Sequence, residues 1–294
     1  MPRNLLIVFT LILFCALSAA GQNRKRKSAP EPTPTPSEEP EEFKGINWQK
    51  GPSVGQLGTT AEVRVPAGYV FAGSADTRTI MEAYHNPLTG KEVGYVAPSG
   101  ENWFAVFEFD AVGYVKDDEK SSLDANAMLD SIRAGTEASN RERQSRGWPT
   151  MTVIGWEQQP RYDESTHNLE WAIKAQSEGL PVVNYNTRLL GRSGVMEVTL
   201  VTDPSTLAET LPKFKAMLAG FGFTQGHRYA EFRAGDKVAE YGLTGLIVGG
   251  TTAVLVKSGA FKWLWKVLVA AAIGVAALVK KIFSRRGQNP SATT

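Results

Sequence analysis

Side chains suited to acid–base chemistry gather in one short segment of this chain. They are Asp163, Glu164, His167 and Glu170. A carboxylate close to a histidine can tune the pKa of a general base. A polar turn over residues 161–166 accounts for the same residues without catalysis. Because strand alternation puts His167 with the apolar face and Glu170 with the opposite one, we favour the turn and assign no catalytic residue here.

A second group of acidic side chains could hold a hard cation. It consists of Asp110, Asp117, Asp118, Glu119 and Asp124. The group lacks the alternating ligands and central glycine of a calcium loop, so we favour a solvated turn that leads into a helix. His85, His167 and His227 are separated by 82 and 60 residues, which gives no local metal-ligand spacing. We therefore expect no metal and no cofactor.

Motifs of the common enzyme classes are absent from the sequence. It contains no Gly-x-Ser-x-Gly, Ser-x-x-Lys, His-Glu-x-x-His, P-loop or dinucleotide-binding motif. A polar recognition face is the remaining candidate, formed by Asn184, Tyr185 and Asn186 near Arg188 and Arg192. Tyr and Arg are enriched at binding hot spots, although both are also ordinary residues of a strand surface.

The elements that must position these residues mix two periodicities. Leu169, Trp171 and Ile173 alternate with polar neighbours, which predicts a strand with one wet face. Residues 104–109, 151–158 and 196–200 predict further strands, and short turns between neighbours indicate an antiparallel meander.

Two helical regions accompany the strands. Residues 121–146 predict a helix whose C-terminal half is exposed. A second region follows Asp203 and Pro204, with a break expected at Pro212 and an end at Gly220. The predicted fold class is α+β: an antiparallel sheet flanked by helices on one face, with a C-terminal transmembrane helical region.

The N-terminal end indicates export. Arg3, the apolar residues 5–17 and the small residues 18–20 predict a signal peptide over residues 1–20. The apolar run has 13 residues, too short at 1.5 Å per residue to cross a hydrocarbon core of about 30 Å. Its Cys15 is the only cysteine, so a cleaved protein has no disulfide chemistry. Residues 21–45 are rich in Pro and Glu and predict a disordered linker.

Charge divides the remainder of the chain into two parts. Residues 46–236, the predicted extracytoplasmic domain, hold 18 Lys and Arg against 24 Asp and Glu, a net charge of −6. Residues 237–294 hold 8 against 1, a net charge of +7. A domain of negative net charge is a poor partner for a phosphate backbone, so we expect no nucleic-acid binding.

The basic tail is predicted to enter the membrane. We assign residues 237–286 to a membrane region, with residues 263–279 as the favoured span, and residues 287–294 to a disordered tail. Basic residues after the span suit the cytoplasmic side. A helical hairpin of residues 241–256 and 264–279 is the alternative, but it would place those basic residues on the exported side. Gly245 and Gly249 form a small-xxx-small pair through which two copies could associate.

Several motifs resemble a bacterial family of predicted membrane-anchored proteins, known as a domain of unknown function. They cover residues 113–119, 123–130, 135–140, 155–156, 160–163, 169–172, 184–186 and 190–192. The resemblance runs from about Trp48 through the tail and implies an exported protein with a C-terminal anchor. It implies no reaction and no catalytic residue.

Two functional classes remain after these exclusions. The first is a non-enzymatic binding or scaffolding module, held by its C-terminal helix in the lipid bilayer of the inner membrane, facing the periplasm or cell exterior and serving an envelope protein or another ligand. The second is an envelope hydrolase with carboxylate acid–base catalysis, which needs Asp or Glu side chains that converge in a cleft. Sequence spacing cannot show such convergence.

Overall fold

The computed structural model describes residues 43–120 and 123–248. The predicted signal peptide, nearly all of the predicted linker and the favoured span at residues 263–279 lie outside these residues. Within the described ranges, no helix is long and apolar enough to cross a membrane. The transmembrane helix therefore stays a prediction.

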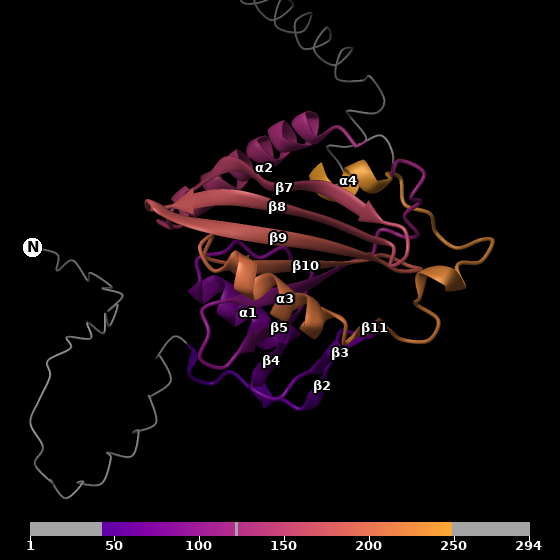
Figure 1. Cartoon of the computed structure of the whole chain (residues 1–294), viewed down its shortest axis with the longest axis horizontal. Helices are drawn as coiled ribbons and strands as arrows, with labels where there is room; N and C mark the ends of the chain where they lie inside the picture. Colours follow the sequence, from indigo (N-terminus) through magenta and orange to yellow (C-terminus); the bar gives the residue numbers. More distant parts are fainter. Residues whose placement is uncertain (1–42, 121–122, 249–294) are drawn as a thin grey trace, which may run out of the picture. The chain divides into compact units, whose positions relative to one another are not determined.

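Eight strands form one antiparallel sheet in the order β1-β4-β5-β6-β10-β9-β8-β7 (Figure 1). Their bounds are β1 Gln49–Lys50, β4 Tyr69–Gly73, β5 Glu92–Pro98, β6 Phe104–Asp110, β7 Met151–Asp163, β8 Asn168–Ser177, β9 Leu180–Leu190 and β10 Val195–Thr202. The run from β7 to β10 is the predicted meander, and β10 then pairs with β6. The edge strand β7 shows three register irregularities against β8, while the other edge strand, β1, has two residues.

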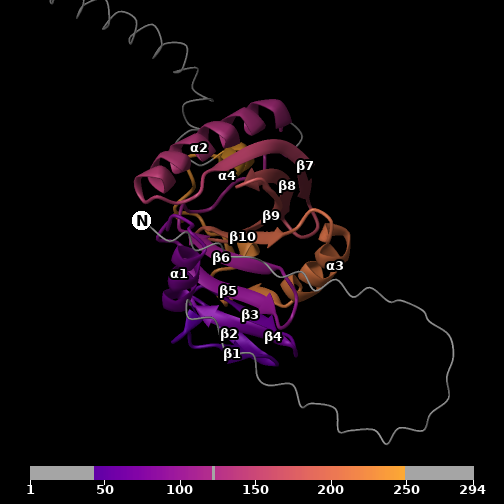
Figure 2. The ribbon, with the colours of Figure 1, turned by 90° about the vertical axis from the view of Figure 1, so that its left-hand side faces the viewer.

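Both faces of this sheet are covered, so the prediction of helices on one face is wrong (Figure 2). One face carries α1 Ser74–Ala83, α2 Ala125–Ser145 and α4 Leu243–Val248. The other carries α3 Leu207–Leu218 and a small sheet of β2 Ser53–Leu57, β3 Ala61–Val65 and β11 Phe221–Phe223. A 3₁₀ turn, η2, spans Tyr229–Glu231.

Strand alternation sends apolar side chains to two separate cores. In β10, Met196, Val198 and Leu200 are fully buried under α3. In β8, Leu169, Trp171 and Ile173 pack instead under α2 and α4. The wet face predicted for β8 is covered only in part: Glu170 and Ala172 are buried on the α3 side of the sheet, whereas Gln176 on that face is exposed. A third, smaller cluster lies under α1.

The two predicted helices form, with one difference. Helix α2 begins after Asp124, whose side chain accepts hydrogen bonds from the backbone N–H groups of Asn126 and Ala127, and most of its C-terminal half is exposed. Helix α3 runs through Pro212, so the expected break is wrong. Pro212 itself faces solvent, while Phe214 and Met217 are buried in the core, and this packing outweighs the lost backbone hydrogen bond.

The folded body continues past the predicted boundary at Asp236. Tyr114 forms a parallel bridge with Val238, and the α4 residues Leu243 and Leu246 are buried in the core under α2. A methyl group on Gly245 would lie 2.3 Å from Cδ2 of Tyr241, so this glycine already serves packing within the chain. Gly249 lies outside the described residues, and association through the glycine pair stays a prediction.

Candidate functional site

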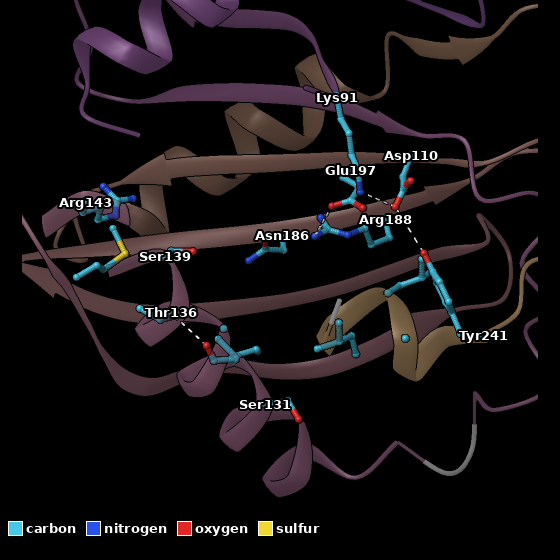
Figure 3. A pocket seen from close by; sticks show the side chains of 16 residues that line it. Lys91, Asp110, Ser131, Thr136, Ser139, Arg143, Asn186, Arg188, Glu197 and Tyr241 are labelled. Carbon is cyan, nitrogen blue, oxygen red and sulfur yellow. Dashed lines mark hydrogen bonds and ion pairs between the residues drawn. The ribbon is translucent and has the colours of Figure 1, made fainter. Parts of the chain in front are cut away.

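The central strands of the large sheet form the floor of a groove between α2, α4 and the loop before β5. Its volume is about 510 Å³. On this floor, Thr199 of β10 lies directly opposite Asn186 of β9 in the paired strands. The Thr199 hydroxyl donates a hydrogen bond to Asn186 Oδ1 at 3.3 Å. Polar side chains that line the groove are Lys91, Asp110, Ser131, Thr136, Ser139, Arg143, Asn186, Arg188, Glu197 and Tyr241 (Figure 3).

Side-chain contacts close the groove at two places. Arg143 of α2 donates to the backbone oxygen of His85 and, at 3.0 Å, to Oδ1 of Asn86. The Tyr241 hydroxyl lies 3.5 Å from Oδ2 of Asp110, and burial raises the pKa of Tyr241. As Figure 3 shows, Arg143 and Tyr241 lie at opposite ends of the lining set. These contacts link α2 to the loop after α1, and the segment before α4 to β6.

A smaller cavity, with apolar side chains along one side, adjoins the groove. It measures about 230 Å³ and shares Ile132, Thr136, Met151, Asn186, Arg188 and Ile247 with the lining of the groove. Its other side chains are mostly apolar and come from β7 and β8: Val153, Trp171, Ile173 and Ala175, with Asn184 and Thr199 from the floor. We call this cavity the apolar pit. Polar groove and apolar pit therefore meet at Arg188 and Asn186.

Arg188 is the most buried cation of the groove, with 8% of its surface exposed. Its Nη2 lies 2.9 Å from Oε2 of Glu197, and its guanidinium carbon lies 4.7 Å from the centre of the Trp171 ring. Nε and Nη1 have no hydrogen-bond partner among the described residues. A buried donor without an acceptor costs about 1–3 kcal/mol.

Three glutamates stand next to Arg188 in one row across the sheet. Glu92 of β5 lies opposite Glu108 of β6, which lies opposite Glu197 of β10, and Glu197 lies opposite Arg188. Like charges directly opposite each other are unfavourable. Burial raises the pKa of Glu108, and the neighbouring charges of Glu197 and Glu92 raise it further, while a hydrogen bond from Thr89 opposes the rise.

Thr89 lies between two glutamates of this row. The Thr89 hydroxyl contacts Oε1 of Glu92 at 3.1 Å and also contacts Oε1 of Glu108. A hydroxyl has one proton to donate, so at most one of these two carboxylates can accept from it. The backbone N–H of Thr89 also donates to Oε1 of Glu92, at 2.6 Å, so Glu92 keeps a donor when the hydroxyl turns to Glu108.

The two carboxylates inside the groove each have a cationic partner. Asp110 pairs with Lys91 at 2.7 Å, and Glu197 pairs with Arg188 at 2.9 Å. Each pair is a close, charge-assisted contact that occupies an oxygen of the carboxylate. The groove thus collects carboxylates, as a hydrolase would require, but holds them as ion pairs.

The segment proposed for acid–base chemistry separates in the structure. His167 Nδ1 lies 3.1 Å from the Tyr162 hydroxyl, and that hydroxyl donates to Asp117 at 2.9 Å. Glu170 projects to the opposite face, where it accepts hydrogen bonds from Tyr185 at 2.8 Å and Lys215 at 3.1 Å. His167 and Glu170 therefore belong to different environments, as strand alternation predicts.

The turn interpretation of the same segment is supported by local bonds. Asp163 accepts from the backbone N–H and hydroxyl of Ser165, and these bonds hold its pKa below the ordinary value. Glu164 pairs with Lys120 at 2.8 Å on the surface. A cavity of about 490 Å³ on the α3 side is lined by Asp163 and Glu170 among others, with no histidine in its lining.

The acidic side chains considered for cation binding have different partners in the structure. Asp124 caps α2, Asp110 pairs with Lys91, and Glu119 accepts from the backbone N–H of Thr244. The three histidines likewise have different neighbours: Trp148 for His85, Tyr162 and Tyr229 for His167, and Ser193 for His227. Over residues 43–120 and 123–248, no cluster of His, Cys, Asp or Glu could hold a metal ion.

The polar recognition segment is the part of the sequence prediction that reaches the groove. Asn184, Asn186 and Arg188 occupy alternate positions of β9 and line the groove or its pit. Tyr185 turns to the other face and is 1% exposed, and Arg192 forms two bonds of 2.7 Å with Asp236. Sequence reasoning missed Lys91, Glu92 and Glu108 and the α2 hydroxyls. The available signal was Glu108, a lone acid within the apolar run of residues 104–109.

Comparisons with known proteins identify a family but no activity. The family described as Protein of unknown function (DUF2167) matches residues 49–280. No curated protein matches the chain. Among solved structures, cyanobacterial PsbP (CyanoP) from Synechocystis sp. PCC 6803 is similar, with 10% identity, a TM-score of 0.34, and coverage of 60% of this chain and 92% of that one.

A second similar structure is a protein of unknown function, PA94, from Pseudomonas aeruginosa. It has 14% identity and a TM-score of 0.23, and the match covers 56% of this chain and 91% of that one. Both similarities are too weak to support an assignment of function. The site must be interpreted from its own geometry.

Proposed function

Since this chain belongs to the family of proteins of unknown function DUF2167, we propose its function from the groove: the folded body is a non-enzymatic binding module for a small polar ligand. The observation that carries this proposal is the pairing of both groove carboxylates with cations, Asp110 with Lys91 and Glu197 with Arg188. Paired charges, amides and hydroxyls suit recognition of a ligand by fixed donors and acceptors.

The alternative, an envelope hydrolase, finds less support. General-base catalysis needs a carboxylate that is free to take a proton near the operating pH. Lys91 and Arg188 hold Asp110 and Glu197 in ion pairs, and His167 lies outside the lining of the groove. We therefore keep the binding module as the proposed function.

We further propose that the module works in the bacterial envelope, anchored in the inner membrane by residues 263–279, with the body outside the cytoplasm. The basic tail after this segment and the apolar N-terminus support the proposal. A reporter fused after Arg286 should be active only in the cytoplasm. Activity of a periplasmic reporter at that position would instead support the hairpin.

The binding function can be tested on the full chain purified in mild detergent. Native mass spectrometry should reveal a co-purified small molecule. Ser139 is an exposed residue of the groove wall on α2, and Ser145 is exposed on the same helix outside the lining. Ser139→Trp should abolish the bound mass, whereas the matched control Ser145→Trp should retain it. A wild-type chain that carries no small molecule, or equal loading of both variants, would contradict the proposal.

A further inference from the structure

The ligand chemistry of the groove can be inferred from Arg188. Its side chain is more than nine-tenths buried, yet Nε and Nη1 have no hydrogen-bond partner among the described residues. Native structures almost always satisfy buried donors with protein groups, water or ligands. Because Arg188 lines both the groove and the apolar pit, a ligand at their junction lies next to these donors.

The charge of the groove favours an acidic ligand group. Three cations line it, Lys91, Arg143 and Arg188, against two carboxylates, Asp110 and Glu197. Arg143 donates to two neutral oxygens, and no carboxylate pairs with it within the part of the chain that the structure describes. Charge-assisted hydrogen bonds to a guanidinium are stronger than neutral ones.

The pit adds an apolar requirement. Trp171, Ile173 and Ala175 form part of its wall and are almost fully buried, and Ile132 of α2 faces them. Apolar side chains form one side of this cavity of about 230 Å³ and polar side chains of the floor form the other, so an aliphatic group of a ligand can pack against the apolar side. One molecule can place an acidic group and an apolar group side by side here, because the two cavities share the Arg188 and Thr136 side chains.

We propose that the groove binds a small amphipathic anion, with its carboxylate or phosphate head at Arg188 and its short apolar tail in the pit. This inference rests on the proposed binding function and names its ligand class. Free carboxylates and phosphate monoesters share the chemistry of the head, and the two are separated below by the choice of probe.

The test uses calorimetric titration of the full chain in mild detergent, with protein-free micelles as the blank. The probes are hexanoate and hexyl phosphate, which carry head and tail, acetate, which has the head alone, and 1-hexanol, which has the tail alone. At least one of the two amphipathic probes should bind about tenfold or more tighter than acetate and 1-hexanol, because the pit removes methylene groups from water. Binding of hexanoate alone would indicate a carboxylate head, and of hexyl phosphate alone a phosphate head. Equal affinity for the amphipathic probe and 1-hexanol would overturn the inference.

Two variants test the binding sites for the head and the tail of the ligand separately. Arg188→Lys keeps the charge beside Glu197 but removes the guanidinium donors, and it should weaken the amphipathic probe about tenfold while Arg141→Lys, exposed on α2, leaves it unchanged. Thr136→Phe fills the pit and should reduce the amphipathic probe to the affinity of acetate. Thermal unfolding of each variant checks its folding. Unchanged affinity in a folded Arg188→Lys or Thr136→Phe chain would contradict the inference.

The two proposals can fail separately. If the wild-type chain co-purifies with a small molecule that Ser139→Trp excludes, but binds none of the amphipathic probes, the ligand class is wrong while the binding module stands. If neither a co-purified molecule nor probe binding is found, both proposals fall.

Discussion

Asn140 is expected to fix the wall of the groove. It is 6% exposed on α2, its Nδ2 donates to the backbone oxygen of Met151 at 2.8 Å, and its Oδ1 accepts from the Met151 N–H at 2.9 Å. One amide side chain thus satisfies both backbone groups where β7 begins, and it holds the helix that carries Ser139 and Arg143.

The cost of removing this amide follows from those two bonds. Asn140→Ala leaves two backbone groups of half-buried Met151 unpaired, at about 1–1.5 kcal/mol each. The higher helix propensity of alanine offsets about 0.5 kcal/mol of this loss in stability. The net loss is about 2 kcal/mol, which corresponds to a fall in Tm of about 4–8 °C for a domain of this size.

The assay is thermal unfolding of the full chain in mild detergent, followed by tryptophan fluorescence, together with hydrogen exchange of α2 and β7. Asn126→Ala is the matched control, because Asn126 is exposed on the same helix and its side chain has no partner among the described residues. The control should keep or slightly raise Tm. If Asn140→Ala and Asn126→Ala unfold at the same temperature with equal exchange at Met151, the reasoning is refuted.

Three further substitutions test the electrostatics and the backbone. Burial raises the pKa of Glu108 above its ordinary value of 4.5, so wild-type stability should fall as pH rises from about 4.5 through the raised pKa; Glu108→Gln should remove this fall in pH-dependent urea unfolding. Arg192 lowers the pKa of Asp236 to about 2, so its stabilising contribution is present above about 3.8 and lost as pH falls through about 2. Asp236→Asn should flatten this acid limb, and an unchanged limb would contradict the pairing. Pro212→Ala restores an N–H that can donate to the Ala208 carbonyl in α3, and it should raise the unfolding free energy by about 1–2 kcal/mol in urea titration.

Local sequence patterns predicted strands and helices correctly where a single local feature, such as alternation or an N-cap residue, determines the element. The alternation of Met196, Val198 and Leu200 identifies β10, and Asp124 marks the start of α2. The same patterns failed where distant elements decide the environment. Glu170 looks solvated in its own strand, yet α3 covers it from another part of the chain.

The groove could not be predicted from sequence because its floor depends on long-range strand pairing. Alternation tells on which face Glu108 and Glu197 lie, but only the pairing of β6 with β10 puts them side by side. The sequence offered Asn186 and Arg188 only as candidates for a polar recognition face, because Tyr and Arg are enriched at binding hot spots. The residues that complete the groove lie on strands far away in the sequence, and local periodicity cannot predict which distant strands pair.

The edge strands of the large sheet limit how copies of this protein can meet. At one edge β1 offers two residues, and at the other the irregularities of β7 and the Asn140 amide interrupt the regular row of free backbone groups. A neighbouring chain thus finds no continuous template for adding a strand. Contacts between copies at these two edges must therefore be built from side chains instead of a shared backbone ladder.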